Sequence, residues 1–110
     1  GGKVAAPTLK IARLALQDLL PRDGRRGVVD PYVVITGISV DAQERWNTKR
    51  NERRPVWEEG KALAYDPMGY SVEVWDDDYG NGNGDDLLGT AEVTLPRGQD
   101  ALGAPLSLLW

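Results

Sequence analysis

The chain has 110 residues, of which 41% are hydrophobic, a size and composition that fit one domain with a single core. It contains no cysteine and no histidine, which excludes disulfides, thiol catalysis and zinc–thiolate sites and removes the commonest general base. Without histidine, we expect no catalytic activity. The hydrophobic segments are short, so we expect no transmembrane helix, and the net charge of −4 argues against nucleic-acid binding.

The first candidate element, residues 9–20, has an ambiguous pattern. Its leucines at 9, 16, 19 and 20 fit the apolar stripe of a helix, and its helix propensity is good. In a strand, the apolar residues would shift from odd positions (9 and 11) to even positions (14 and 16), which requires a β-bulge. The pattern alone leaves both interpretations open, and the strands expected elsewhere favour a strand.

The rest of the chain has the pattern of short strands bounded by glycine and proline. Residues 32–36 are mostly β-branched, 70–74 and 90–95 alternate apolar and polar side chains, and 43–50 is a candidate edge strand. Residues 56–65 form a further candidate that Gly60 interrupts. This spacing of turn residues favours an all-β sandwich.

The run V-W-D-D-D-Y-G-N-G-N-G-D-D-L-L-G at 74–89 is the most informative segment. Five aspartates fall within positions 76–86 with no lysine or arginine among them, and the rest of the chain carries 13 basic and 12 acidic residues. Two carboxylates about 5 Å apart repel by roughly 3 kcal/mol at an effective dielectric constant of about 20, so crowding them requires a counter-charge. Hard oxygen ligands on a flexible backbone suit Ca²⁺. The alternative is a solvated surface turn.

Several ordered motifs then resemble those of the C2 domain family over residues 9–95. They are L-Q-D-L-L-P at 16–21, D-P-Y-V at 30–33, T-K at 48–49, P-V-W-E-E at 55–59, V-W-D-D-D at 74–78 and D-L-L-G at 86–89. The last two resemble in particular the C2 domain of perforin-like proteins. The resemblance implies an eight-stranded antiparallel β-sandwich and a single domain over 1–110 that belongs to a larger protein. Type II strand order is favoured, in which residues 104–110 could form the last strand.

The resemblance also implies a set of calcium ligands at one tip of the sandwich, holding two or three Ca²⁺ ions. It assigns the side chains of Asp23, Asp30, Asp76, Asp78 and Asp86 and the main-chain carbonyl of Asp77 as ligands. The segments 23–30 and 78–86 are each one residue longer than usual in the family, so Asp85 could replace Asp86 as the ligand.

Basic and apolar residues near the same tip are expected to contact lipid. These are Arg25, Arg26, Val28, Val29, Lys49, Arg50, Arg53, Arg54 and Tyr79. For the two valines, packing beneath the loops is an equally good interpretation, and for the basic residues an ordinary polar loop is the alternative. Each lysine or arginine near an anionic bilayer contributes about 1 kcal/mol to binding.

The sequence therefore predicts a monomeric calcium-binding module that docks on anionic phospholipid membranes through these loops. The alternative is a calcium-stabilised structural domain, or one that binds protein or glycan without membrane activity. Partner proteins and domains of a parent protein remain open, as does a cytoplasmic or secreted location, because C2 domains occur in both compartments.

Overall fold

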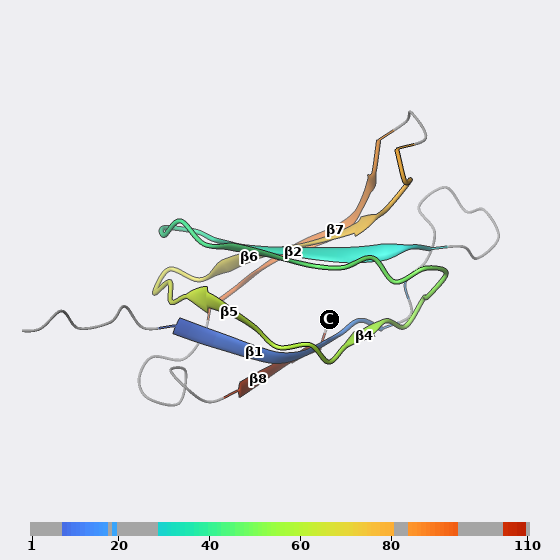
Figure 1. Cartoon of the computed structure of the whole chain (residues 1–110). Coiled ribbons are helices and arrows are strands. Elements are labelled where there is room, and N and C mark those ends of the chain that lie inside the picture. The colour runs from blue at the N-terminus through green and yellow to red at the C-terminus, as the bar shows by residue number, and fades with distance from the viewer. Residues whose placement is uncertain (1–7, 18, 20–28, 81–83, 95–104, 110) are drawn as a thin grey trace, which may run out of the picture.

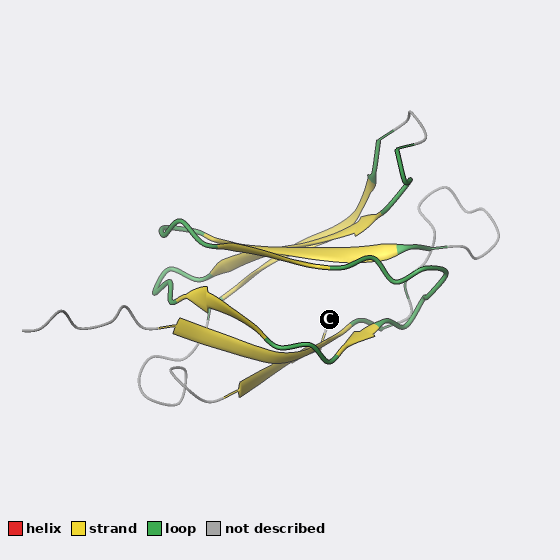
Figure 2. Ribbon diagram, viewed as in Figure 1, coloured by secondary structure: helices red, strands yellow, loops and turns green. Residues whose placement is uncertain are grey.

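The computed structural model describes residues 8–17, 19, 29–80, 84–94 and, for the backbone, 105–109. It contains β1 (Thr8–Ala15), β2 (Pro31–Gly37), β3 (Gln43–Trp46), β4 (Val56–Trp57), β5 (Lys61–Ala64), β6 (Tyr70–Asp76), β7 (Asp86–Val93) and β8 (Pro105–Leu109). The predicted all-β sandwich is confirmed (Figure 2). No helix among the described residues is long and apolar enough to cross a membrane.

The strands form two layers (Figure 1). One sheet has the order β3-β2-β6-β7 with every neighbouring pair antiparallel, and it places the predicted edge strand β3 at an edge. In the other sheet, β1 pairs antiparallel with β4 and β5 but parallel with β8. The C-terminal strand was thus correctly expected, but its parallel direction corrects the expectation of an entirely antiparallel sandwich.

Strand β1 resolves the ambiguity of residues 9–20 in favour of a strand. Its register with β8 shifts between Ile11 and Arg13, the position where the apolar pattern changes from odd to even. On either side of this irregularity Leu9 and Ile11, then Leu14 and Leu16, are buried. The bulge rotates the strand by one residue, so both apolar pairs face the core.

The core lies between the layers because the strands alternate inward and outward side chains. In β6, Val72 and Val74 are buried, whereas Ser71 and Glu73 beside them are only partly buried. Trp46 and Trp57 contribute the largest buried side chains, at 0% and 2% exposure. Full burial of one large apolar side chain contributes about 1.5–3 kcal/mol, so these residues hold the two sheets together.

One end of the sandwich gathers three chain segments that are distant in sequence. The N–H of Asp77, after β6, donates to the carbonyl of Asp30, before β2, at 2.9 Å. The N–H of Lys49, after β3, donates to the carbonyl of Pro31, also at 2.9 Å. We call this end the acidic tip, defined by Asp30, residues 47–54 and the β6–β7 loop (Figure 1).

Candidate functional site

The acidic tip contains a cluster of three carboxylates in the loop between β6 and β7. One ligand oxygen from each of Asp77, Asp78 and Asp85 lies within 4.8 Å of the others. The antiparallel pairing of β6 with β7, which places Asp76 opposite Asp86, folds the loop back and brings its two ends together. Sequence proximity alone accounts for Asp77 and Asp78, but only the hairpin brings Asp85 to them.

Asp78 carries an acceptor atom that no other group of the described structure satisfies. Its Oδ1 accepts the N–H of Gly80 at 2.9 Å, whereas its Oδ2 is buried and has no hydrogen-bond partner. A buried carboxylate oxygen without a partner is costly, and an oxygen-seeking cation would satisfy it. The donor set, entirely of oxygen atoms, therefore fits Ca²⁺.

Asp85 is held by two hydrogen bonds. Its Oδ1 accepts the Asp78 N–H at 3.0 Å, and its Oδ2 accepts the Tyr32 hydroxyl at 2.5 Å. The Asp78 N–H first, and the Tyr32 hydroxyl second, lower the pKa of Asp85 and keep it ionised. Conversely, burial, together with the Asp85 carboxylate, raises the pKa of Tyr32 and keeps its hydroxyl a donor.

The geometry distinguishes Asp85 from Asp86 as a ligand. Asp85 belongs to the cluster with Asp77 and Asp78, whereas Asp86 is exposed as the first residue of β7. The end of the loop thus places Asp85, rather than Asp86, within the cluster of carboxylates. We retain Asp85 as the proposed ligand from this end of the loop.

Asp30 and Asp76 lie beside the cluster and are fixed to each other. The Asp30 N–H donates to Asp76 Oδ1 at 3.0 Å, and Asp30 Oδ1 accepts the Asn51 N–H at 2.7 Å. These contacts connect the start of β2 with the end of β6 and with the segment after β3. They bring a residue far away in sequence next to the acidic loop, as the resemblance implied.

The side chain of Asp77 has a role that sequence reasoning missed. Only its main-chain carbonyl was assigned, yet its Oδ2 accepts the Thr48 hydroxyl at 2.6 Å and lies 3.6 Å from Arg45 Nη2. Its Oδ1 accepts the Tyr79 N–H at 2.8 Å. Thr48 and Tyr32 belong to the recognised T-K and D-P-Y-V motifs, so the motifs did mark them, although without a role.

The residues expected to contact lipid occupy different environments. Lys49 and Arg50 are exposed, and the Arg50 guanidinium lies 4.9 Å from the ring centre of Tyr79, which is 46% exposed. Arg53 is partly buried, and its Nε donates to the Leu19 carbonyl at 2.9 Å. Arg53 therefore also has a structural role that the sequence did not indicate.

Val29 departs most clearly from the lipid-contact expectation. It is completely buried within the hydrophobic core, so its side chain packs beneath the loops rather than projecting from them. This matches the packing interpretation that the sequence left open. Four other expected site residues, Asp23, Arg25, Arg26 and Val28, lie outside the described residues.

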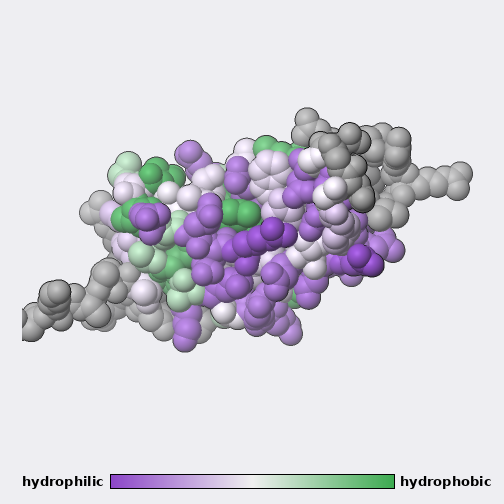
Figure 3. Space-filling view, turned by 45° about the horizontal axis from the view of Figure 1, so that its top comes forward, coloured by the Kyte–Doolittle hydropathy of each residue, from purple (hydrophilic) through white to green (hydrophobic). Residues whose placement is uncertain are grey.

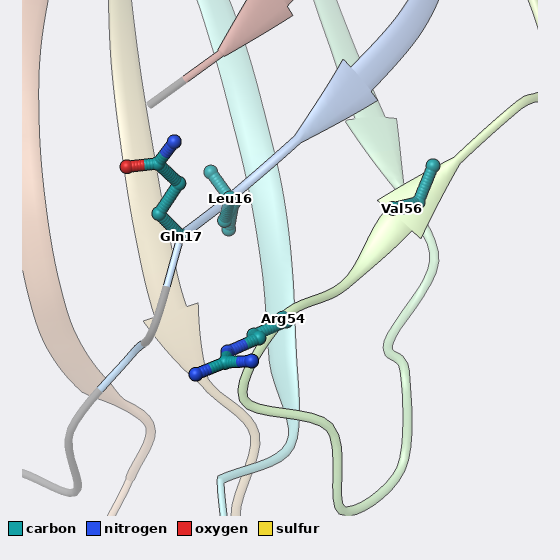
Figure 4. Close-up of a pocket in the computed structure, with 4 residues that line it drawn as sticks. All are labelled: Leu16, Gln17, Arg54 and Val56. Carbon is teal, nitrogen blue, oxygen red and sulfur yellow. The ribbon is translucent and has the colours of Figure 1, made fainter.

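A separate surface pocket of about 440 Å³ lies where β1 ends and β4 begins. Leu16 and Gln17 line it from one segment and Arg54 and Val56 from the other (Figure 4). None of the described aspartates lines this pocket. It is therefore distinct from the carboxylate cluster, and Arg54 belongs to its wall.

The two sheets and the carboxylate cluster at one end define the class: an all-β sandwich with an acidic tip. The family model of the C2 domain matches residues 7–106. This protein belongs to the C2 domain family. No curated protein sequence matches the chain.

Solved structures show the same fold. The first C2 domain of plant extended synaptotagmin 1 is similar at 16% identity and a TM-score of 0.64, covering 84% of this chain and 71% of that one. A structure of two C2 domains of extended synaptotagmin 2 gives 26% identity and a TM-score of 0.60, and the match covers 83% of this chain and 31% of that one. The structure of the same two domains with calcium bound gives 23% identity and a TM-score of 0.59, and the match covers 83% of this chain and 35% of that one.

A larger protein is also similar. Human GIVD cytosolic phospholipase A2 in complex with a fluorophosphonate matches at 21% identity and a TM-score of 0.56, and the match covers 78% of this chain. The match spans only 12% of that enzyme chain. The similarity to it is therefore one of fold.

Proposed function

We propose that this domain binds Ca²⁺ at its acidic tip and thereby docks on anionic phospholipid membranes. The observation that carries the proposal is the cluster of Asp77, Asp78 and Asp85, in which the buried Oδ2 of Asp78 has no partner among the described residues. Asp30 and Asp76 are held next to it by hydrogen bonds. The calcium-bound relative and the membership of the C2 family support the same conclusion.

Each group at the tip has a part in this proposal. Asp77, Asp78 and Asp85 hold the ion with Asp30 and Asp76 beside them, together with Asp23 as the resemblance implies. Bound Ca²⁺ would supply positive charge and coordination positions open to lipid oxygens. Without it, the crowded carboxylates repel an anionic surface. Lys49 and Arg50, exposed beside the cluster, add attraction to lipid phosphates.

The test is co-sedimentation with phosphatidylserine-containing vesicles, in Ca²⁺ and in EGTA. We expect binding by the wild type in Ca²⁺ alone, and a loss of at least about tenfold in Asp78→Asn because one charged ligand is removed. Asp41→Asn is the matched control, since Asp41 is exposed in the turn between β2 and β3. It should bind as the wild type does.

Two outcomes would contradict the proposal. Equal vesicle binding by Asp78→Asn and wild type in Ca²⁺ would remove the carboxylate cluster from the mechanism. Calcium binding by the wild type without any vesicle binding would leave the alternative, a calcium-stabilised structural or protein- or glycan-binding domain.

A further inference from the structure

Two aspartates of the acidic loop are tied to side chains of the β3-β2-β6-β7 sheet. The Tyr32 hydroxyl of β2 donates to Asp85 Oδ2 at 2.5 Å, and the Thr48 hydroxyl, just beyond β3, donates to Asp77 Oδ2 at 2.6 Å. These bonds join residues that are 53 and 29 positions apart in the chain. The sheet thus fixes both ends of the loop, at Asp77 and at Asp85.

Arg45 connects the two attachments. Its guanidinium carbon lies 3.9 Å from the ring centre of Tyr32, and its Nη2 lies 3.3 Å from Thr48 Oγ1 and 3.6 Å from Asp77 Oδ2. The Tyr32 ring also stacks on Trp75, with centroids 6.5 Å apart and planes 11° from parallel. We call Tyr32, Arg45 and Thr48 the brace.

The brace lies on the outer face of the sheet. Val33 and Trp46, the neighbours of Tyr32 and Arg45 in their strands, are completely buried in the core. Because side chains alternate along a strand, Tyr32 and Arg45 point to the opposite face. Tyr32 is buried, at 8% exposure, but it does not belong to the cluster of core side chains between the two sheets.

We propose that the brace sets the affinity of the acidic tip for a divalent cation through two opposed effects. Tyr32 is a positioning residue that strengthens binding by orienting Asp85, whereas Arg45 weakens binding as a built-in counter-charge to Asp77. The inference rests on the proposed calcium site but not on membrane docking.

The signs follow from the chemistry of each contact. A hydrogen bond to a ligating carboxylate orients it before the cation arrives, and loss of such a contact typically lowers affinity about 10- to 100-fold. A guanidinium beside a carboxylate already neutralises part of the charge that attracts the cation, and it repels the cation directly. Arg45 is about half exposed, at 52%, so solvent weakens its effect without cancelling it.

The experiment is a calorimetric titration of the purified domain with CaCl₂ in the absence of lipid. Tyr32→Phe should weaken calcium binding by about tenfold or more, because it removes the hydroxyl and keeps the stacked ring. Arg45→Met should tighten binding by about threefold or more, and this gain should shrink as NaCl is raised. A purely structural role for both residues would weaken binding in both variants.

Two variants away from the acidic tip provide matched controls. Tyr70→Phe removes a buried hydroxyl that bonds to the Ala64 carbonyl at 2.7 Å, and Arg13→Met removes an exposed guanidinium 4.0 Å from Glu58. Both should leave calcium affinity unchanged. Melting temperatures of all four variants in EGTA would show that each one folds.

The outcomes separate the two proposals. Calcium affinities of Tyr32→Phe and Arg45→Met that equal the wild-type affinity, or that shift in the same direction, overturn the brace and leave the calcium site standing. Opposite shifts support the brace even if no vesicle is bound. A wild-type chain that does not bind Ca²⁺ overturns both.

Discussion

At the scale of single residues, Asp66 is the buried charge on which the end opposite the acidic tip depends. It is 1% exposed, and its two carboxylate oxygens accept the Ser39 N–H and hydroxyl, the Val40 N–H and the Met68 N–H. Burial alone would raise the pKa of Asp66, but these hydrogen bonds outweigh it and lower the pKa to about 2. The ionised form of Asp66 therefore stabilises the fold.

We predict a corresponding loss of stability in acid. Above the ordinary aspartate pKa, 3.8, Asp66 is ionised in both states and its stabilisation is complete. As the pH falls from 3.8 towards about 2, Asp66 becomes protonated in the unfolded chain but stays ionised in the folded chain. The unfolded state is thereby favoured, and the stabilisation from Asp66 is lost. Asp66→Asn should lower the melting temperature by about 5–10 °C at neutral pH and by much less near pH 2.

Melting curves of both proteins across this pH range, recorded in EGTA, would test the prediction. A constant difference in melting temperature at all pH values would mean that the shape of the Asp66 side chain matters and its charge does not. No sequence pattern marked this residue, because the donors of Ser39 and Val40 come from a turn more than twenty-five positions away.

At the scale of elements, the strands were predictable where the pattern of side chains is local. Alternation marked β6 and the second half of β7, whose first half, from Asp86, was expected to belong to the acidic loop. The change of phase between Ile11 and Leu14 marked the bulge in β1. The direction of β8 was not predictable in this way, because a strand shows the same pattern parallel or antiparallel. Pairing direction depends on the path of the connection, which side-chain periodicity does not encode.

The candidate site also has a part that local motifs predicted and a part that depends on how the strands pair. The D-P-Y-V and D-D-D motifs indicated which aspartates to consider, and the hairpin of β6 and β7 did bring Asp85 to Asp77 and Asp78. The contacts of Tyr32 and Arg45 with this loop depend on the register of three strands. One residue of slip would turn these side chains to the other face, so the sequence alone could not assign them.

The turn that leads into β6 yields a prediction about Gly69. Its φ is +106°, and a Cβ atom at this position would lie 2.4 Å from the Val93 carbonyl oxygen of β7. Gly69→Ala therefore combines an unfavourable backbone conformation with a clash against backbone, and should destabilise the fold by about 2–4 kcal/mol. Urea unfolding in EGTA measures this difference.

Gly80→Ala is the matched control, since Gly80 also has a positive φ, +78°, but no atom of the described residues lies within 4 Å of an added Cβ. It should cost about 1–2 kcal/mol, the conformational term alone. Similar losses in both variants would show that the contact with Val93 relaxes easily and that only the backbone conformation of Gly69 is required.

At the scale of the whole molecule, charge is unevenly distributed. The chain carries a net charge of −4, yet five of its 17 acidic residues fall within positions 76–86. Hydrophilic side chains cover most of the described face in Figure 3, and hydrophobic residues gather at its left end. The mutual repulsion of the loop carboxylates is a cost of folding that the proposed cation would relieve.

This balance predicts a crossover in stability between wild type and Asp78→Asn. In EGTA the variant should melt at the same temperature as the wild type or slightly above it, because one repelling charge is gone and the amide oxygen still accepts the Gly80 N–H. In Ca²⁺ at about 100 times the dissociation constant, the wild type should gain about 2.7 kcal/mol and the variant far less. Melting curves in the two buffers, with Mg²⁺ as a third, measure both effects. Mg²⁺ should stabilise less than Ca²⁺ does, because it demands a near-ideal octahedral shell and gives up its bound water reluctantly. A variant that is clearly less stable already in EGTA would show that Asp78 supports the fold by itself, independently of any ion.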